Sequence, residues 1–441
     1  MGILMRLPSR LQGGLPNTLV ATSTVALAGL VSGVVLARTL GPMQRGELAI
    51  VLLWPIALGI AGDLGLSFAF SFFAGKRPEW LDGLWSLGWG ASLIWGGVLA
   101  VAGAAVVGAA LHLSPSLVST LRLAMLSVPL AFATNYQGFL LLGSGRLVES
   151  NLVRVATAWF YALGVVAVAV AGRGGIGAYT AVYVVAQALA CLVATALALW
   201  RLHPSLALPA GLVRPVFVYG MKSYVGSIAG QMNVRIDQLL MSAILLPFEL
   251  GLYVVALAVA GMLGPFYSAL AIVVLPRVTQ AGDLAGGGRQ VVHHLQLGML
   301  VAVPATIVAL AVVPFALPVV FGVAFVHAVP AAEILLVAGV FQGANIVLGN
   351  GLFGLGRPGL VAVAQGSTLI LATCLLLLLL PRLGGVGAAI ALLCSYGTAM
   401  LVQVGFVAQT TGLPGRAFWT LRWREVLPDL AAIERRWRGV A

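Results

Sequence analysis

Long apolar runs alternate with short polar connectors along the whole chain. Twelve runs of about 19–31 residues can be marked, at 17–37, 48–74, 84–111, 117–142, 150–171, 177–199, 216–246, 251–275, 291–318, 330–353, 359–380 and 387–408. A helix of this length, rising about 1.5 Å per residue, crosses a hydrocarbon core of roughly 30 Å. The pattern predicts an all-α polytopic membrane protein with twelve transmembrane helices.

Composition and charge support this class and predict an orientation. Hydrophobic residues make up 61% of the 441 and charged residues only 8%, whereas soluble domains carry about a quarter. Eighteen of the 24 lysines and arginines fall on the side of the N-terminus, and five on the other side. Because cytoplasmic loops carry the positive excess, we expect a multi-pass protein of the cytoplasmic (inner) membrane with both termini cytoplasmic. The same distribution explains the net charge of +12 without a nucleic-acid partner.

Three short motifs recur in the same order at nearly one offset. They are Leu40-Gly-Pro-Met-Gln-Arg-Gly46 with Leu245-Leu-Pro-Phe-Glu-Leu-Gly251, Gly143-Ser-Gly-Arg146 with Gly354-Leu-Gly-Arg357, and Gly174-Gly-Ile-Gly-Ala178 with Gly384-Gly-Val-Gly-Ala388. The offset covers six helices, which predicts two six-helix bundles related by a pseudo-twofold axis along the membrane normal. We place the N-terminal bundle at 1–200, a cytoplasmic linker at 201–215, the C-terminal bundle at 216–411 and a tail at 412–441.

The seventh apolar run carries a polar stripe. Its members follow helical spacing and are Ser223, Ser227, Gln231, Arg235, Gln238 and Ser242. A polar face in a membrane helix lies against water or polar partners, so Arg235, Gln231 and Gln238 are candidate substrate contacts. The planar guanidinium suits phosphate, because it engages two oxygens at once. The alternative is that Arg235 is an ion-paired structural group.

Three acids lie within the apolar runs. Asp63 is deep in the second run, Asp237 is on a different face from the stripe, and Glu333 is near the outer end of its helix. Because buried charge in a membrane is costly, such groups face protein or water, and we take them as candidates for ion coupling or ion pairing. Asp63 could instead balance Arg235 or Arg38.

Two arginines, Arg38 and Arg45, lie on the outer side, against the general bias. They are either anion-attracting substrate contacts or ordinary loop charges.

The tail mixes arginine with tryptophan from Arg416 to Gly439. We expect it to lie on anionic lipid at the cytoplasmic surface, with docking of a partner enzyme as the alternative. No nucleotide fingerprint, phosphate-cradling loop or metal-ligand cluster occurs in the sequence, so we expect no cofactor, no metal and no enzymatic activity.

Two segments carry a family resemblance. ARTLGPMQRGELAIVLLWP with GDLGLSFAF, and RIDQLLMSAILLPFELGLYVVALAVAG followed by LPRVTQ, resemble the Wzx-type polysaccharide flippases. These belong to the superfamily of the MATE exporters and the lipid II flippase MurJ. The resemblance covers the first ten runs and implies two six-helix bundles arranged as a V. It also implies a central cationic cavity for the sugar–pyrophosphate head of an undecaprenyl-linked oligosaccharide.

The expected function is therefore a flippase that moves undecaprenyl-pyrophosphate-linked oligosaccharides across the membrane by alternating access for surface polysaccharide assembly. We expect a monomer, with a polysaccharide polymerase or glycosyltransferase as possible partners. Three alternatives stay open: a cation-coupled multidrug antiporter of the MATE type, a MurJ-like lipid II flippase, and a non-transporting scaffold. The antiporter would bind organic cations at Asp63 and Asp237.

Overall fold

The computed structural model describes residues 14–110 and 113–420, and this part of the chain contains helices and no strand. The first half comprises α1 (Gly14–Gly62), α2 (Leu66–Lys76), η2 (Pro78–Trp80), α3 (Leu81–Gly90), η3 (Ala91–Trp95), α4 (Gly96–Ala110), α5 (Pro115–Met125), α6 (Ser127–Gly143), α7 (Leu147–Val170) and α8 (Ile176–Leu202). The second half comprises α9 (Val213–Asn233), α10 (Ile236–Ile244), α11 (Pro247–Ala260), η4 (Gly261–Leu263), α12 (Gly264–Gln280), α13 (Leu284–Phe321), η5 (Val323–Ala328), α14 (Val329–Gly354), α15 (Pro358–Thr411) and η6 (Gly415–Phe418). Most of the basic tail, residues 421–441, lies outside the described residues.

Nine helical segments of the described chain are long and apolar enough to cross a membrane. They confirm the expected class, an all-helical multi-pass membrane protein. Two of the nine are much longer than one crossing requires, since α1 has 49 residues and α15 has 54. Each contains one non-helical glycine, Gly41 in α1 and Gly384 in α15. At about 1.5 Å per residue, each helix has the length of two crossings. The polar pair α9 and α10 is not among the nine.

The repeated Gly-x-Gly-Arg motifs end α6 and α14 in the same way. Gly145 and Gly356 have left-handed backbone angles, with φ of 78° and 72°. The next amide closes each end, because Arg146 N donates to Leu141 O at 2.8 Å and Arg357 N donates to Leu352 O at 2.9 Å. This is the Schellman arrangement, which needs a residue that tolerates positive φ. The repeat in the sequence is therefore a repeat of local structure.

The two copies of the Leu-x-Pro-x-x-x-Gly motif touch each other. A Cβ built on Gly46 would overlap the carbonyl group of Pro247, and a Cβ on Gly251 would overlap that of Pro42. Helix α1 packs along α11 at this contact. The absence of side chains on both glycines allows the two backbones to approach this closely. We call this end of the molecule, with residues 42–46 and 247–251, the narrow end.

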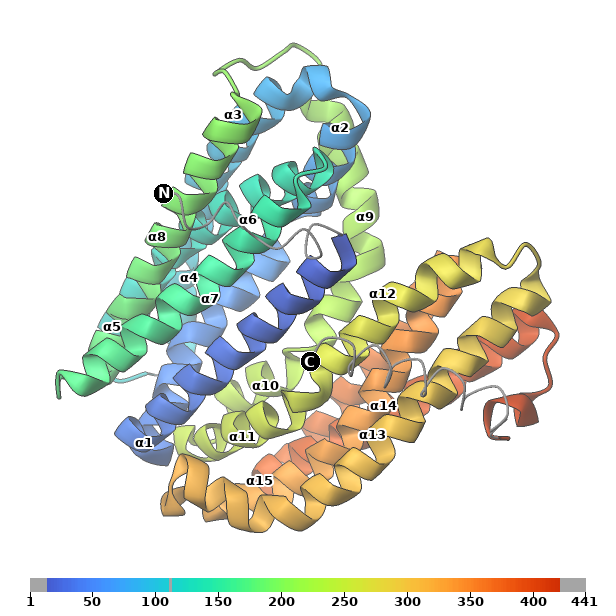
Figure 1. Cartoon of the computed structure of the whole chain (residues 1–441). Helices are drawn as coiled ribbons and strands as arrows, with labels where there is room; N and C mark the ends of the chain where they lie inside the picture. The colour runs from blue at the N-terminus through green and yellow to red at the C-terminus, as the bar shows by residue number, and fades with distance from the viewer. Residues whose placement is uncertain (1–13, 111–112, 421–441) are drawn as a thin grey trace, which may run out of the picture.

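From the narrow end the two halves of the chain diverge (Figure 1). Helices α1–α8 form one arm, and α11–α15 form the other, with α9 beside the first arm. Helix α9 packs on α2 and on α15, so it bridges the arms. The opposite end, which carries Lys76 and the turn at residues 281–283, is the wide end. The bridging helix α9 thus lies between the arms where polar groups can gather.

Candidate functional site

A break in the helical path lies at Asp63. Helix α1 ends at Gly62 and α2 begins at Leu66, with Leu64 and Gly65 at positive φ between them. The freed carbonyl groups have partners: Tyr224 OH donates to Ala61 O at 2.7 Å, and Trp95 Nε1 donates to Gly62 O at 2.8 Å. Irregular backbone within a membrane is tolerated where such partners exist. The break turns the Asp63 side chain toward a cavity.

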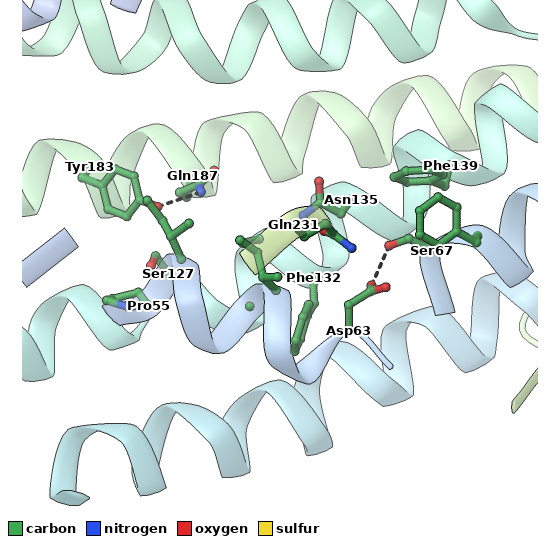
Figure 2. Close-up of a pocket in the computed structure, with 15 residues that line it drawn as sticks. Pro55, Asp63, Ser67, Ser127, Phe132, Asn135, Phe139, Tyr183, Gln187 and Gln231 are labelled. Carbon is green, nitrogen blue, oxygen red and sulfur yellow. Dashed lines mark hydrogen bonds between the residues drawn. The ribbon is translucent and has the colours of Figure 1, made fainter. Parts of the chain in front are cut away.

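This cavity, the Asp63 cavity, has a volume of about 300 Å³ (Figure 2). Its polar lining comes from four helices and the break, and comprises Asp63, Ser67, Ser127, Asn135, Tyr183, Gln187 and Gln231. Ser67 Oγ donates to Asp63 Oδ1 at 2.6 Å. Tyr183 and Asp63 lie at opposite ends of the cavity in Figure 2. Besides the Asp63 carboxyl, the lining has six amide or hydroxyl side chains. It contains no lysine or arginine of the described residues.

A second cavity, the Lys222 cavity, adjoins the first and has a volume of about 570 Å³. Phe68 and Phe139 line both cavities, and their rings pack edge to face with centroids 5.9 Å apart. Helix α9 also runs along both, since Ser223 and Ser227 line the second cavity and Gln231 lines the first. The first three members of the polar stripe therefore follow one path between the arms.

The stripe does not continue as one helix through Arg235, and that expectation is corrected. Helix α9 ends at Asn233 and α10 begins at Ile236, leaving Arg235 in the break. Two groups hold the break: Asn233 Nδ2 donates to the Gln365 carbonyl at 2.9 Å, and Tyr396 OH donates to Asn233 O at 3.4 Å. Beyond it, Gln238 is half-buried and Ser242 is buried.

Arg235 is half-buried and lies within electrostatic range of Tyr183 and Asp237. Within the described ranges it forms no ion pair. Neither of the two adjoining cavities has Arg235 in its lining. Along the chain, Arg235 follows Gln231 and lies in the break between α9 and α10.

The two outer arginines have different surroundings. Arg38 Nε donates to Val320 O at 2.8 Å, and its Nη2 donates to Val319 O. These are among the last carbonyls of α13, so Arg38 caps a helix C-terminus of the other arm, where a cation is favoured. Arg45 is half-buried beside Tyr161 in the first arm, and its Nε has no partner among the described residues. Neither arginine lines the two adjoining cavities.

Asp237 is buried in the second arm. Tyr253 OH donates to Asp237 Oδ2 at 2.7 Å, while Oδ1 has no partner within the described chain. The carboxyl also lines a separate cavity of about 230 Å³, with Tyr267 and Tyr396. Glu333 is half-buried near the start of α14 and lines none of these three cavities.

Two charged residues, Lys222 and Glu249, were not among the site candidates taken from the sequence. Lys222 counts among the orienting charges, yet it lines a cavity between the arms. Its signal was its position next to Ser223 in the polar stripe. Glu249 was also missed: its Oε2 accepts a hydrogen bond from Gly385 N at 3.1 Å, beside the non-helical Gly384. In the described residues no group of three or more His, Cys, Asp or Glu side chains is placed to hold a metal.

The arrangement of helices is the fold of solved helical membrane transporters. Solved structures with the same fold include the lipid II flippase MurJ in an inward closed conformation, with a TM-score of 0.72 and 13% identity over 91% of this chain and 89% of that one. An inward-facing multidrug resistance MATE transporter of the MOP superfamily gives a TM-score of 0.71 at 13% identity, covering 88% of this chain and 96% of that one.

Sequence similarity defines the family more narrowly. Residues 35–330 match the family described as "Polysaccharide biosynthesis protein", and the chain belongs to this family. A curated relative from Haloferax volcanii, "Probable low-salt glycan biosynthesis flippase Agl15", is 26% identical over 198 residues. That alignment covers 44% of this chain and 42% of the relative.

Proposed function

We propose that this protein is a flippase that moves undecaprenyl-pyrophosphate-linked oligosaccharide units across the cytoplasmic membrane by alternating access. The observation that carries the proposal is the pair of adjoining polar cavities between the arms, together with the glycine contact that closes the narrow end. A head group can enter such a path from the wide end while its polyprenyl chain stays in lipid. Membership of the polysaccharide biosynthesis family supports a glycan cargo. The proposed role is transport of an unchanged molecule, and it involves no enzymatic reaction.

We propose twelve crossings for the arms. Counting α1 and α15 as two crossings each, and α9 with α10 as one, brings the nine candidates to twelve. Six then belong to each half, as two bundles at 1–200 and 216–411 joined by the linker 201–215. The reciprocal contact of Gly46 and Gly251 supports a pseudo-twofold axis along the membrane normal. We propose that the wide end and both termini lie in the cytoplasm, because cytoplasmic segments carry the positive excess.

Cargo movement follows from the order of polar groups along α9 and α10. Lys222 and Gln231 line the path that is open between the arms. Arg235 lies in the break that follows α9, and Gln238 follows it in α10. When the arms rock so that the narrow end opens, the head group would meet Arg235 next. The guanidinium then holds phosphate in the outward-facing state, where its planar donors fit two oxygens.

One observation favours a second candidate, a cation-coupled antiporter for organic cations. The Asp63 cavity contains a carboxyl and no lysine or arginine, so it suits a cation better than a bare anion. In the flippase, the same carboxyl and Asp237 are the proposed coupling groups, because each is an acid in a cavity within an apolar protein.

Deleting the gene and analysing lipid extracts separates the candidates. A polysaccharide flippase predicts loss of a surface glycan and accumulation of its lipid-linked precursor, both restored by the wild-type gene. Accumulated lipid II with arrested wall synthesis would assign the protein to lipid II instead. Unchanged glycans with increased sensitivity to organic cations would support the antiporter and refute the flippase.

A further inference from the structure

The two adjoining cavities differ in charge. The Lys222 cavity has a lysine ammonium group and the hydroxyls of Ser71, Ser223 and Ser227, and no acid of the described residues lines it. The Asp63 cavity has a carboxyl and neutral amides and hydroxyls, and within residues 14–110 and 113–420 no base lines it. Arg235 lies within electrostatic range of Tyr183. Tyr183 is at the end of the cavity opposite Asp63 (Figure 2). A ligand that spans both cavities therefore meets positive charge in one and negative charge in the other.

The Lys222 cavity also presents aromatic rings. Phe72 of α2 stacks on Tyr219 of α9 with centroids 4.2 Å apart and ring planes 14° from parallel. Phe68, Phe72 and Phe353 line the cavity and keep 39%, 36% and 49% of their side chains exposed. Exposed rings beside hydroxyl groups suit a sugar, whose C–H face packs on a ring while its hydroxyls bond to the rim. The stack joins α2 to α9, so this wall lies where the bridging helix meets the first arm.

The Phe68–Phe139 pair separates the two cavities. Both rings line both spaces, and no other side chain in the described part of the protein does. Figure 2 shows Phe139 and Ser67 at the Asp63 end of the first cavity. A chain of sugars that passes from one cavity to the other must therefore pass these rings. Ser67, bonded to Asp63, follows directly beyond them.

We propose that the head group lies with its phosphate end at Lys222 and its glycan across the Phe68–Phe139 pair in the Asp63 cavity, so that the glycan carried is neutral or basic. This deepens the flippase function proposed above and rests on it. A lysine is a point charge suited to phosphate. An acidic sugar beside Asp63 would bring two like charges together in a partly desolvated site, which is unfavourable. Neutral sugars bond instead to Asn135, Gln187 and Gln231, which line the same space.

Binding to the purified full-length protein in lipid nanodiscs tests the assignment. The probes are two polyprenyl pyrophosphate disaccharides that differ in the second sugar, a neutral hexose in one and the matching uronic acid in the other. We expect wild-type protein to bind the neutral probe about tenfold more tightly. Asp63→Asn should remove most of that difference by improving the acidic probe. Lys222→Gln should weaken both probes by a similar factor of about ten, and Lys222→Arg should keep most of the affinity.

Matched controls remove a charge elsewhere. Arg289→Gln removes an exposed base of α13, and Glu47→Gln removes a half-buried acid of α1; neither residue lines the two cavities. Both controls should keep wild-type affinities, and every variant is checked for a monodisperse elution profile. Equal wild-type affinity for the two probes would overturn the glycan selectivity and leave the flippase standing. Weakening by Arg235→Gln but not by Lys222→Gln would overturn the phosphate position. Failure of folded wild-type protein to bind either probe would refute the flippase itself.

Discussion

The role of a charged residue in this protein depends on the groups that the fold places beside it, as two arginines show. Arg38 and Arg235 have the same side chain, and both were candidates for holding phosphate. Arg38 donates to two carbonyls at the end of α13, so its donors are occupied by the other arm. Arg235 sits in a helix break, and in the described chain it has no ion-pair partner. We expect Arg38 to stabilise the folded protein and Arg235 to bind the phosphate of the cargo.

Arg38→Gln should lower the free energy of unfolding by about 1 kcal/mol, because an exposed helix cap contributes in that range. Binding of the neutral lipid-linked probe should not change. Thermal unfolding in detergent and the nanodisc binding assay measure the two quantities. Arg173→Gln, which removes another exposed arginine, serves as the control. Lost binding with unchanged stability would return Arg38 to the substrate contacts.

Arg235→Ala should lower transport by at least about tenfold and leave inward-facing binding near the wild-type value. Arg235→Lys should keep part of the activity, because the charge remains while the planar donors are lost. Export of glycan and membrane abundance are measured for each variant. If Arg235 is instead a structural ion-pair partner, pairing Arg235→Ala with Asp63→Asn or Asp237→Asn should restore both abundance and export. Such a rescue would sink the transport role.

We propose that Asp63 or Asp237 couples transport to an ion gradient. Replacing the coupling acid with asparagine should reduce flux in liposomes and make the remaining flux independent of the imposed ion gradient. The physical reason is that the amide cannot exchange a proton or hold a cation by charge. Proton and sodium gradients are imposed separately, with Glu47→Gln as the control. Full gradient dependence in both asparagine variants would make both carboxyls structural.

At the scale of elements, the helices are interrupted where the chain needs polar groups or close contacts. The break between α1 and α2 frees carbonyls that Tyr224 and Trp95 satisfy, and it places Asp63 in a cavity. At the narrow end, Gly46 and Gly251 have no side chains, and this allows α1 and α11 to touch. The cavity therefore depends on a helix break with satisfied carbonyls, and the closed narrow end depends on glycines.

Gly46→Ala should destabilise the closed narrow end by about 1–3 kcal/mol, the usual range for adding a methyl group to a packed contact. The added Cβ would overlap the Pro247 carbonyl, so α1 and α11 must move apart. Thermal unfolding measures the loss, and labelling of a cysteine at Gln44 measures exposure of the narrow end. Gly29→Ala in the same helix is the control, because a Cβ there meets no atom within 4 Å. Equal effects of the two substitutions would show that the contact is not specific.

At the scale of the whole molecule, two arms meet at one end and diverge toward the other (Figure 1). The arms have matching local structure at the ends of α6 and α14 and a reciprocal contact between α1 and α11. Such a duplicated body can exchange which end is closed by rocking one arm against the other. The ends must then face opposite sides of the membrane.

Single-cysteine labelling tests this orientation in a background without Cys191, Cys374 and Cys394. Positions 44, 79 and 280 are exposed, and they sample the narrow end and the wide end. A membrane-impermeant maleimide should label Gln44→Cys in intact cells, and Glu79→Cys and Gln280→Cys only after the membrane is opened. Labelling of position 79 in intact cells would reverse the orientation.

The sequence alone determined the membrane class and the repeated helix ends. Spanning a bilayer requires a long apolar run, and this requirement is local, so it is visible in the order of residues. The same holds for the Gly-x-Gly-Arg helix ends, because a positive φ is a property of one residue. The polar stripe of α9 was also predictable as far as Gln231, where helical spacing alone places the side chains.

Only the tertiary structure decided which polar groups work together. The α9 break follows Asn233 without a proline or glycine there, and its groups bond to Gln365 and Tyr396, more than a hundred residues away. Arg38 caps a helix that ends about 280 residues later. Lys222 is an ordinary orienting charge in the sequence and a cavity group in the fold. Charge interactions and helix capping depend on the distance between groups in space. Spacing along the sequence predicts that distance only for groups in the same helix.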